Sequence, residues 1–233
     1  MDMFTLFLIA HLIGGFSSLL LLWIPLLTKK GGKWHNRVGW LFVYGMSLVS
    51  VSAVGMASIR IFVQPDTTPE RMQFSIFLLF IATLSAVSAY YGIRVLKFKK
   101  KEPRHRQPLD LAASALLFLA GLGCVVYGMI IGNSLITFFP LLGVFLGAGQ
   151  LRYWLKPMTT KKSWIVEHIT GMLTCSISTV TAFTVFGAPR LIGVDSSHIL
   201  LWFLPTIIFL PLIFWFTNKY GAVKKSGGAT RAS

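Results

Sequence analysis

The sequence predicts an all-α, polytopic membrane protein: a bundle of seven transmembrane helices with its N-terminus outside and its C-terminus cytoplasmic. Its 233 residues are 55% hydrophobic and only 12% charged, and the mean hydropathy of +0.70 exceeds that of soluble domains. Seven apolar stretches are each close to or longer than the ~20 residues that a spanning helix needs. Basic residues gather in alternate connections between these stretches, as the positive-inside rule requires.

The seven stretches give the expected helices in order. They cover residues 3–27, 38–63, 73–96, 109–131, 134–155, 164–187 and 199–217. Because lipid offers the backbone no hydrogen-bond partner, segments of this length are expected to be helical. The fourth and fifth helices are joined only by "IGNS", which predicts an antiparallel pair. Pro140, Pro205 and Pro211 are expected to kink the fifth and seventh helices.

The net charge of +15 is distributed as a topology signal. All but three of the 22 lysines and arginines lie in four segments that seven crossings place on one side. These segments are residues 28–37, 94–106, 152–162 and the tail after residue 217, and the exceptions are Arg60, Arg71 and Arg190. The charge therefore does not indicate a nucleic-acid partner. We expect the basic side to face the cytoplasm of a bacterial cell and to contact anionic lipid there.

No part of the chain outside the helices has enough apolar residues to form a core of its own. We therefore expect one transmembrane domain over residues 1–218 and a flexible basic cytoplasmic tail over residues 219–233. The first helix has no basic segment before it and no small-residue cleavage site, so we interpret it as retained. Any function is then expected between the helices or at their ends.

Ionisable side chains at membrane depth are the candidates for function, because their burial in lipid is costly. His11 lies within the first helix, and Glu167 and His168 lie one turn into the sixth. His35 precedes the second helix on the same side as His168. We expect His35 and His168 to come together on the cytoplasmic side, and His11 to lie near His198 on the outer side.

One face of the sixth helix is more polar than helix packing requires. Glu167, Gly171, Thr174, Ser178 and Thr181 recur there at helical spacing. This pattern predicts a polar face that is turned into the bundle.

Three further residues are expected to support the histidines and Glu167. A glycine follows the histidine by three residues in both the first and the sixth helix, at Gly14 and Gly171. We expect each glycine to leave space beside the histidine ring. We also expect Arg37, at the cytoplasmic end of the second helix, to lie close to Glu167, because a buried carboxylate needs a partner.

These residues leave three classes of function open. The first is a redox protein in which His11, His35 and His168 bind b-type haem and pass electrons across the membrane, with quinone or a redox protein as partner. The second is a proton-coupled carrier or sensor of a metal or small solute that uses the same histidines and Glu167. The third is a structural role without a cofactor. A zinc hydrolase is less favoured because the chain has no His-x-x-x-His pair, and no catalytic residue is assigned.

The depths of the histidines separate them along the membrane normal. At 1.5 Å per residue, His168 lies about 7 Å inside the inner boundary and His11 about 12 Å inside the outer one. In a ~30 Å hydrocarbon core this leaves about 11 Å between their levels. We therefore expect two sites, or one site in which the second histidine has a supporting role.

Three segments resemble a family of predicted bacterial multi-pass membrane proteins of unknown function. They are "HLIGGFSSLLLLWIPL", "GKWHNRVGWLFVYGM" and "WIVEHITGMLTCSISTVTAFTVF". His11, His35 with Gly39, and His168 with the following "TAF" stretch match the family's three histidine motifs. Where the family often shows Arg directly after the second histidine, this chain has Asn36. The resemblance implies a shared multi-helix architecture and a histidine-bearing site, but no activity.

The distribution of basic residues makes a prediction about topology. In intact cells, introduced cysteines should be labelled from outside in "VQPDTTPER", residues 63–71. They should be protected in "KFKKKEPRHR", residues 97–106, and at the C-terminus. Labelling of a Lys99→Cys variant from the outer face would contradict the predicted orientation.

Overall fold

The computed structural model describes residues 1–64, 68–99, 105, 107–157, 160–192 and 199–221. Every regular element in these residues is a helix, and seven helical segments are long and apolar enough to cross a membrane. They are Met3–Leu27, Lys33–Phe62, Pro69–Lys97, Pro108–Ile130, Ser134–Leu155, Ser163–Gly187 and Leu200–Gly221. The all-α fold class and the seven helices are confirmed, with ends that differ by a few residues. Residues 219–221 of the predicted tail are the last residues of the seventh helical segment, and residues 222–233 lie outside the described residues.

Four of the spanning segments change their helical geometry along their length. The first consists of α1 (Met3–Leu21) and α2 (Trp23–Leu27), and the fifth of α6 (Ser134–Phe138) and α7 (Leu141–Leu155). The third consists of α4 (Pro69–Arg94) and a 3-10 turn, Val95–Lys97. The sixth begins as α8 (Ser163–Ala182) and continues through a π-helical turn, Phe183–Gly187, into α9 (Ala188–Ile192). The other segments are α3 (Lys33–Phe62), α5 (Pro108–Ile131) and α10 (Leu200–Gly221).

The three prolines singled out in the sequence have different effects. Pro140 lies between α6 and α7 and precedes the first residue of α7, so the fifth segment is interrupted there. Pro205 and Pro211 lie inside α10, and the helix continues through both. Transmembrane helices tolerate such prolines when neighbouring groups satisfy the freed backbone carbonyls.

The connection between α5 and α6 shows why four residues suffice to reverse the chain. Gly132 ends α5 with a positive φ of 66°, a conformation that favours glycine. The side chain of Asn133 then accepts a hydrogen bond from the backbone N–H of Ile136 at 3.1 Å and caps α6. The predicted antiparallel pair is present, since α5 packs along α7.

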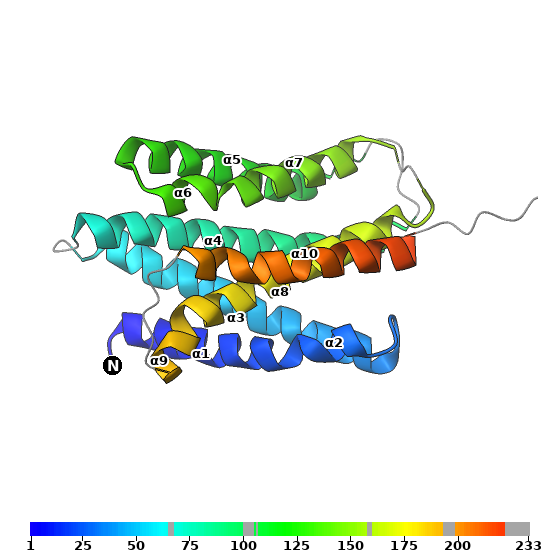
Figure 1. Cartoon of the computed structure of the whole chain (residues 1–233), viewed down its shortest axis with the longest axis horizontal. Helices are drawn as coiled ribbons and strands as arrows, with labels where there is room; N and C mark the ends of the chain where they lie inside the picture. The colour runs from blue at the N-terminus through cyan, green and yellow to red at the C-terminus, as the bar shows by residue number, and fades with distance from the viewer. Residues whose placement is uncertain (65–67, 100–104, 106, 158–159, 193–198, 222–233) are drawn as a thin grey trace, which may run out of the picture.

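The central helix of the bundle is α4. It packs against α3, α5 and α8, while α8 also packs against α10 and α3 against α1. Figure 1 shows α5 and α7 as a layer on one side of α4, with α1 and α3 on the other. In the third and sixth spanning segments 56% of the most apolar window is buried, against 17% in the first. Side chains of α4 and α8 are therefore best placed to form a site between helices.

The connections that carry the positive charge lie together at one end of the bundle. In Figure 1 the ends of α2, α4, α7 and α10 point to the right, away from the N-terminus. We call this the basic end and define it by Lys30, Lys99, Lys156 and Lys219. Lys30 donates to the carbonyl oxygens of Pro25 and Leu26 at 2.8 and 2.6 Å. Burial lowers the pKa of this ammonium group, and Lys219 acts in the same direction.

A buried carboxylate holds α4 and α5 together near the basic end. Asp110 is fully buried and accepts hydrogen bonds from Tyr90 at 2.6 Å and from Arg94 and His105 at 2.7 Å each. The His105 ring stacks on Trp154 of α7 at 4.5 Å between centroids. Because its oxygens have three donors, this carboxylate has a structural role.

Two glycines of α5 offer a matched test of helix packing. A Cβ atom at Gly121 would lie 2.9 Å from the backbone nitrogen of Val144 on α7, whereas one at Gly123 would meet nothing within 4 Å. Gly121→Ala should therefore destabilise the protein by about 1–3 kcal/mol through overpacking. Gly123→Ala should leave stability unchanged or slightly higher, because alanine favours the helix. Thermal unfolding in detergent measures both, and equal effects would contradict the α5–α7 contact.

Candidate functional site

The helices α4 and α8 meet through two glycines, Gly92 and Gly171. A Cβ atom at Gly171 would lie 2.8 Å from the Cα atom of Gly92 and 2.9 Å from the carbonyl oxygen of Ser88. Only a residue without a side chain allows the two backbones to approach so closely. The space that the sequence suggested beside His168 is therefore filled by the backbone of α4.

Gly14 has the same role between α1 and α3. A Cβ atom there would lie 3.0 Å from the carbonyl oxygen of Gly45 and 3.2 Å from a methyl carbon of Val49. This glycine brings the two helices together and leaves no gap beside His11. Both supporting glycines thus serve helix contact, because a missing side chain in a tight bundle is filled by the neighbouring backbone.

His168 and His35 come together, as the sequence predicts. Their ring centroids are 6.3 Å apart with an interplanar angle of 69°. The Nδ1–H of His168 donates to the carbonyl oxygen of Gly92 at 2.6 Å, and that of His35 to the carbonyl oxygen of Pro25 at 3.1 Å. Since a carbonyl oxygen can only accept, each neutral ring keeps its Nε2 as an acceptor.

His11 belongs to a separate site. Its Nδ1 lies 3.2 Å from the carbonyl oxygen of Val49 and 3.1 Å from the hydroxyl of Ser52, both on α3. From His35 to Val49 is 14 residues of α3, or about 21 Å at 1.5 Å per residue. His11 therefore lies far along α3 from His35, in line with two separate sites. His198, the expected neighbour of His11, lies outside the described residues.

Glu167 has a different partner from the one that the sequence suggested. The hydroxyl of Tyr91 on α4 donates to Oε2 of Glu167 at 2.6 Å. Arg37 is exposed and, within the described part of the chain, forms no ion pair with Glu167. The reason is helical geometry: Arg37 lies two residues after His35, about 200° around α3, so it points away when His35 points toward α8.

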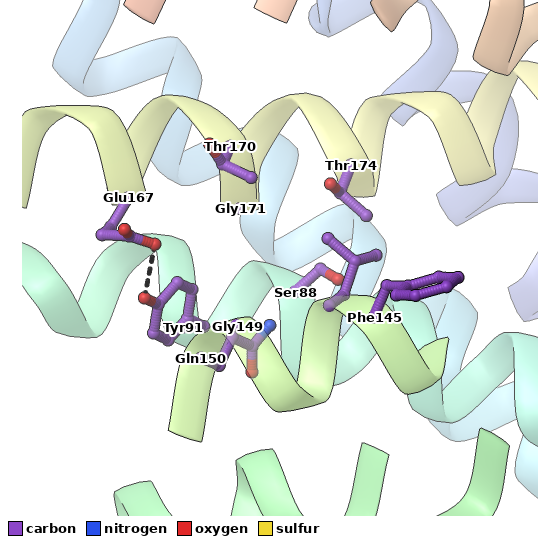
Figure 2. Close-up of a pocket in the computed structure, with 10 residues that line it drawn as sticks. Ser88, Tyr91, Phe145, Gly149, Gln150, Glu167, Thr170, Gly171 and Thr174 are labelled. Carbon is purple, nitrogen blue, oxygen red and sulfur yellow. Dashed lines mark hydrogen bonds between the residues drawn. The ribbon is translucent and has the colours of Figure 1, made fainter. Parts of the chain in front are cut away.

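A cavity of about 90 Å³ lies beside Glu167, between α4, α7 and α8, and its lining combines apolar residues with several polar side chains. Figure 2 shows Tyr91 and Ser88 entering it from α4, Gln150 from α7, and Glu167 and Thr174 from α8. The polar face predicted for the sixth helix therefore does point into the bundle at these two residues.

Two polar side chains beside this cavity are unsatisfied. Ser88 and Gln150 are 1% and 5% exposed, and neither Ser88 Oγ nor Gln150 Oε1 has a hydrogen-bond partner. Leaving such a group buried without a partner costs about 1–3 kcal/mol. The carboxylate of Glu167 lines the same space. The arrangement can therefore bind a small solute that satisfies several oxygen atoms at once.

The sequence alone did not identify Tyr91, Ser88 or Gln150. Tyr91 lies in the tyrosine pair "YY", and only the rotation of α4 decides that Tyr90 reaches Asp110 while Tyr91 reaches Glu167. Gln150 could have been identified from the sequence, because it is a neutral polar residue in the apolar stretch "LLGVFLGAGQL". Amides at membrane depth pair across helices or serve a site.

Within the described residues, no three His, Cys, Asp or Glu side chains are grouped so that they could hold a metal ion. Comparison of the chain with protein-family models, with curated proteins and with solved structures found no match. The resemblance to the bacterial membrane protein family therefore gains no support. The chain is an integral multi-pass membrane protein by the length and apolar character of its helices.

The partner of Glu167 can be tested with two double-mutant cycles. Tyr91→Phe and Glu167→Gln should be non-additive, with a coupling of about 0.5–3 kcal/mol, because Tyr91→Phe removes the donor of the hydrogen bond and Glu167→Gln removes the charge that strengthens the same bond. Arg37→Gln and Glu167→Gln should be additive. Unfolding in detergent micelles measures both cycles. Coupling in the Arg37 cycle together with additivity in the Tyr91 cycle would contradict the contact.

Proposed function

We propose that the protein is a carrier or sensor of a small polar solute, and that solute binding is coupled to proton exchange at Glu167. The observation that carries this proposal is the cavity beside Glu167, where Ser88 and Gln150 have no hydrogen-bond partner. Unsatisfied polar groups are costly within a membrane, so their presence beside a carboxylate supports a ligand that satisfies them.

Asp110 and Glu167 are carboxylates near the basic end, and they differ in a way that supports this proposal. Asp110 has three donors and is fully enclosed, as expected for a structural group. Glu167 instead lines a cavity and is partly exposed. A purely structural role would not require a space of about 90 Å³ beside the carboxylate.

Titratable groups surround Glu167 on its neighbouring helices. Tyr91 donates to the carboxylate, and Tyr153 of α7 packs 6.0 Å from the Tyr91 ring and interacts electrostatically with Glu167. His168 follows Glu167 on α8 and contacts His35. The presence of these titratable groups on neighbouring helices supports Glu167 as the proton-exchanging group of a carrier.

A b-type haem held by His35 and His168 is the second candidate. The two ring centroids are 6.3 Å apart, and because each ring uses Nδ1 for a backbone carbonyl, Nε2 is the nitrogen that would bind the iron. A bound haem would supply one-electron chemistry, with quinone or a redox protein as partner. We rank this function second because Gly171, which was expected to make room for the macrocycle, packs against α4.

Proton coupling can be measured in proteoliposomes that enclose a pH-sensitive dye. Guanidinium, urea and nitrate are planar probes of similar size with different charge, and each is added outside in turn. At least one should change the internal pH faster than in protein-free liposomes. Glu167→Gln should abolish this response because it removes the proton-exchanging group, and Glu70→Gln, an exposed carboxylate outside the cavity, should not.

Two results would decide against the carrier reading. The first is a wild-type response no larger than that of empty liposomes for all three probes. The second is an unchanged response in Glu167→Gln. A Soret band in the purified protein that His168→Ala removes would favour the haem candidate instead.

A further inference from the structure

We propose that the cavity beside Glu167 has an opening to the bilayer between α7 and α8, and that it takes the small hydroxyl head of a single-chain amphiphile dissolved in the membrane. This inference goes beyond the proposed function, because it concerns a ligand that arrives from lipid. It depends neither on proton exchange nor on the charge of Glu167. The position of the opening, the polar atoms inside it and the volume support it.

One side of the cavity reaches the outer surface of the bundle. Phe145 and Gly149 of α7 both line the cavity, and both are exposed, Phe145 to 72%. A Cβ atom at Gly149 would meet nothing within 4 Å, so the space beside it is open. The two residues are one helical turn apart on the same face of α7. Figure 2 shows Phe145 at the end of the cavity that lies away from Glu167. The two residues therefore mark an opening along α7.

The opening lies at the depth of the hydrocarbon core. Phe145 is close to the middle of the spanning segment Ser134–Leu155. At 1.5 Å per residue, Gly149 lies about 9 Å inside the end of this segment. On the opposite side Thr170 of α8 is half-buried, and its hydroxyl donates to the carbonyl oxygen of Val166 at 2.9 Å. A ligand that passes this opening therefore comes from lipid rather than from water.

The polar atoms inside the cavity suit a hydroxyl group. Ser88 Oγ and Gln150 Oε1 are buried and have no hydrogen-bond partner within the described part of the chain. The amide oxygen of Gln150 can only accept, whereas the hydroxyl of Ser88 can also donate. A ligand hydroxyl can donate to the first and accept from the second. It would thus satisfy two groups that are costly to bury without a partner.

The volume admits a small head group and not a whole lipid. A cavity of about 150 Å³ accommodates benzene, and this one measures about 90 Å³. A hydroxyl and the first carbons of a chain fit this space, whereas a quinone ring or a phospholipid head exceeds it. The rest of the chain would leave past Phe145 and Leu146, which line the cavity with apolar surface. A single alkyl chain with a hydroxyl head therefore matches both surroundings.

Photolabelling in phosphatidylcholine nanodiscs tests the inference, because the headgroup of this lipid has no hydrogen-bond donor. The probe is dodecanol with a diazirine on its third carbon, and the control is the methyl ether of the same molecule, which lacks the donor. The alcohol should label the cavity-lining segments of α7 and α8 about fivefold more than the ether, as one additional hydrogen bond implies. Mass spectrometry of the labelled peptides measures this ratio, and excess dodecanol should compete.

Two glycines give matched variants for the route. Gly149→Phe should place a ring in the opening and reduce labelling by the alcohol at least fivefold. Gly123→Phe should leave labelling unchanged, because Gly123 is an exposed glycine of α5 with equally open surroundings and does not line the cavity. Ser88→Ala and Gln150→Leu should each reduce labelling by the alcohol at least threefold and leave the weak labelling by the ether unchanged. Thermal unfolding in the same nanodiscs checks that each variant is folded.

The outcomes that overturn the inference differ from those that overturn the proposed function. Equal labelling by alcohol and ether would mean that the lining contacts only lipid chains. Labelling that persists in Gly149→Phe, or in both Ser88→Ala and Gln150→Leu, would place the ligand elsewhere. If Gly149→Phe does not fold, Gly149→Leu takes its place, with Gly123→Leu as control. Each of these results leaves proton coupling untouched, since that is measured with solute probes in proteoliposomes.

Discussion

The close backbone contact between α4 and α8 at Gly92 and Gly171 is the constraint on which the candidate site depends. It brings the carbonyl oxygen of Gly92 within 2.6 Å of Nδ1 of His168 and so fixes that ring next to His35. It also places the hydroxyl of Tyr91 against Glu167. A side chain at Gly171 would separate the helices and disturb both hydrogen bonds.

Asp110 and Glu167 lie in different surroundings. Asp110 is buried, accepts three hydrogen bonds and holds helices together. Glu167 is partly exposed, accepts a hydrogen bond from Tyr91 and lines a cavity with Ser88 and Gln150. Because lipid cannot satisfy polar atoms, groups left without a partner at this depth carry information about function. The histidines form two further groups. His35 lies next to His168, and His11 contacts Val49, which is about 21 Å along α3 from His35.

Hydropathy and segment length were enough to predict the seven helices, since both follow from the physics of the bilayer rather than from tertiary contacts. The pairing of His35 with His168 was also predictable, because both lie near the same helix ends. The role of Gly171 was not, since a glycine next to a histidine marks either open space or a tight contact. Nor could the partner of Glu167 be predicted, because the choice between Tyr91 and Arg37 depends on how α3 and α4 are rotated.

The most direct test of this account asks whether a small cation reaches the cavity. In a Cys175→Ala background, Thr174→Cys introduces a thiol on the cavity wall, and the native Cys124, buried in the apolar core, serves as internal control. The reaction of each thiol with silver ion is then measured by loss of later maleimide labelling in denaturant. We expect the thiol at position 174 to react rapidly while Cys124 stays protected. Equal protection of both thiols in the folded protein would contradict an accessible cavity beside Glu167.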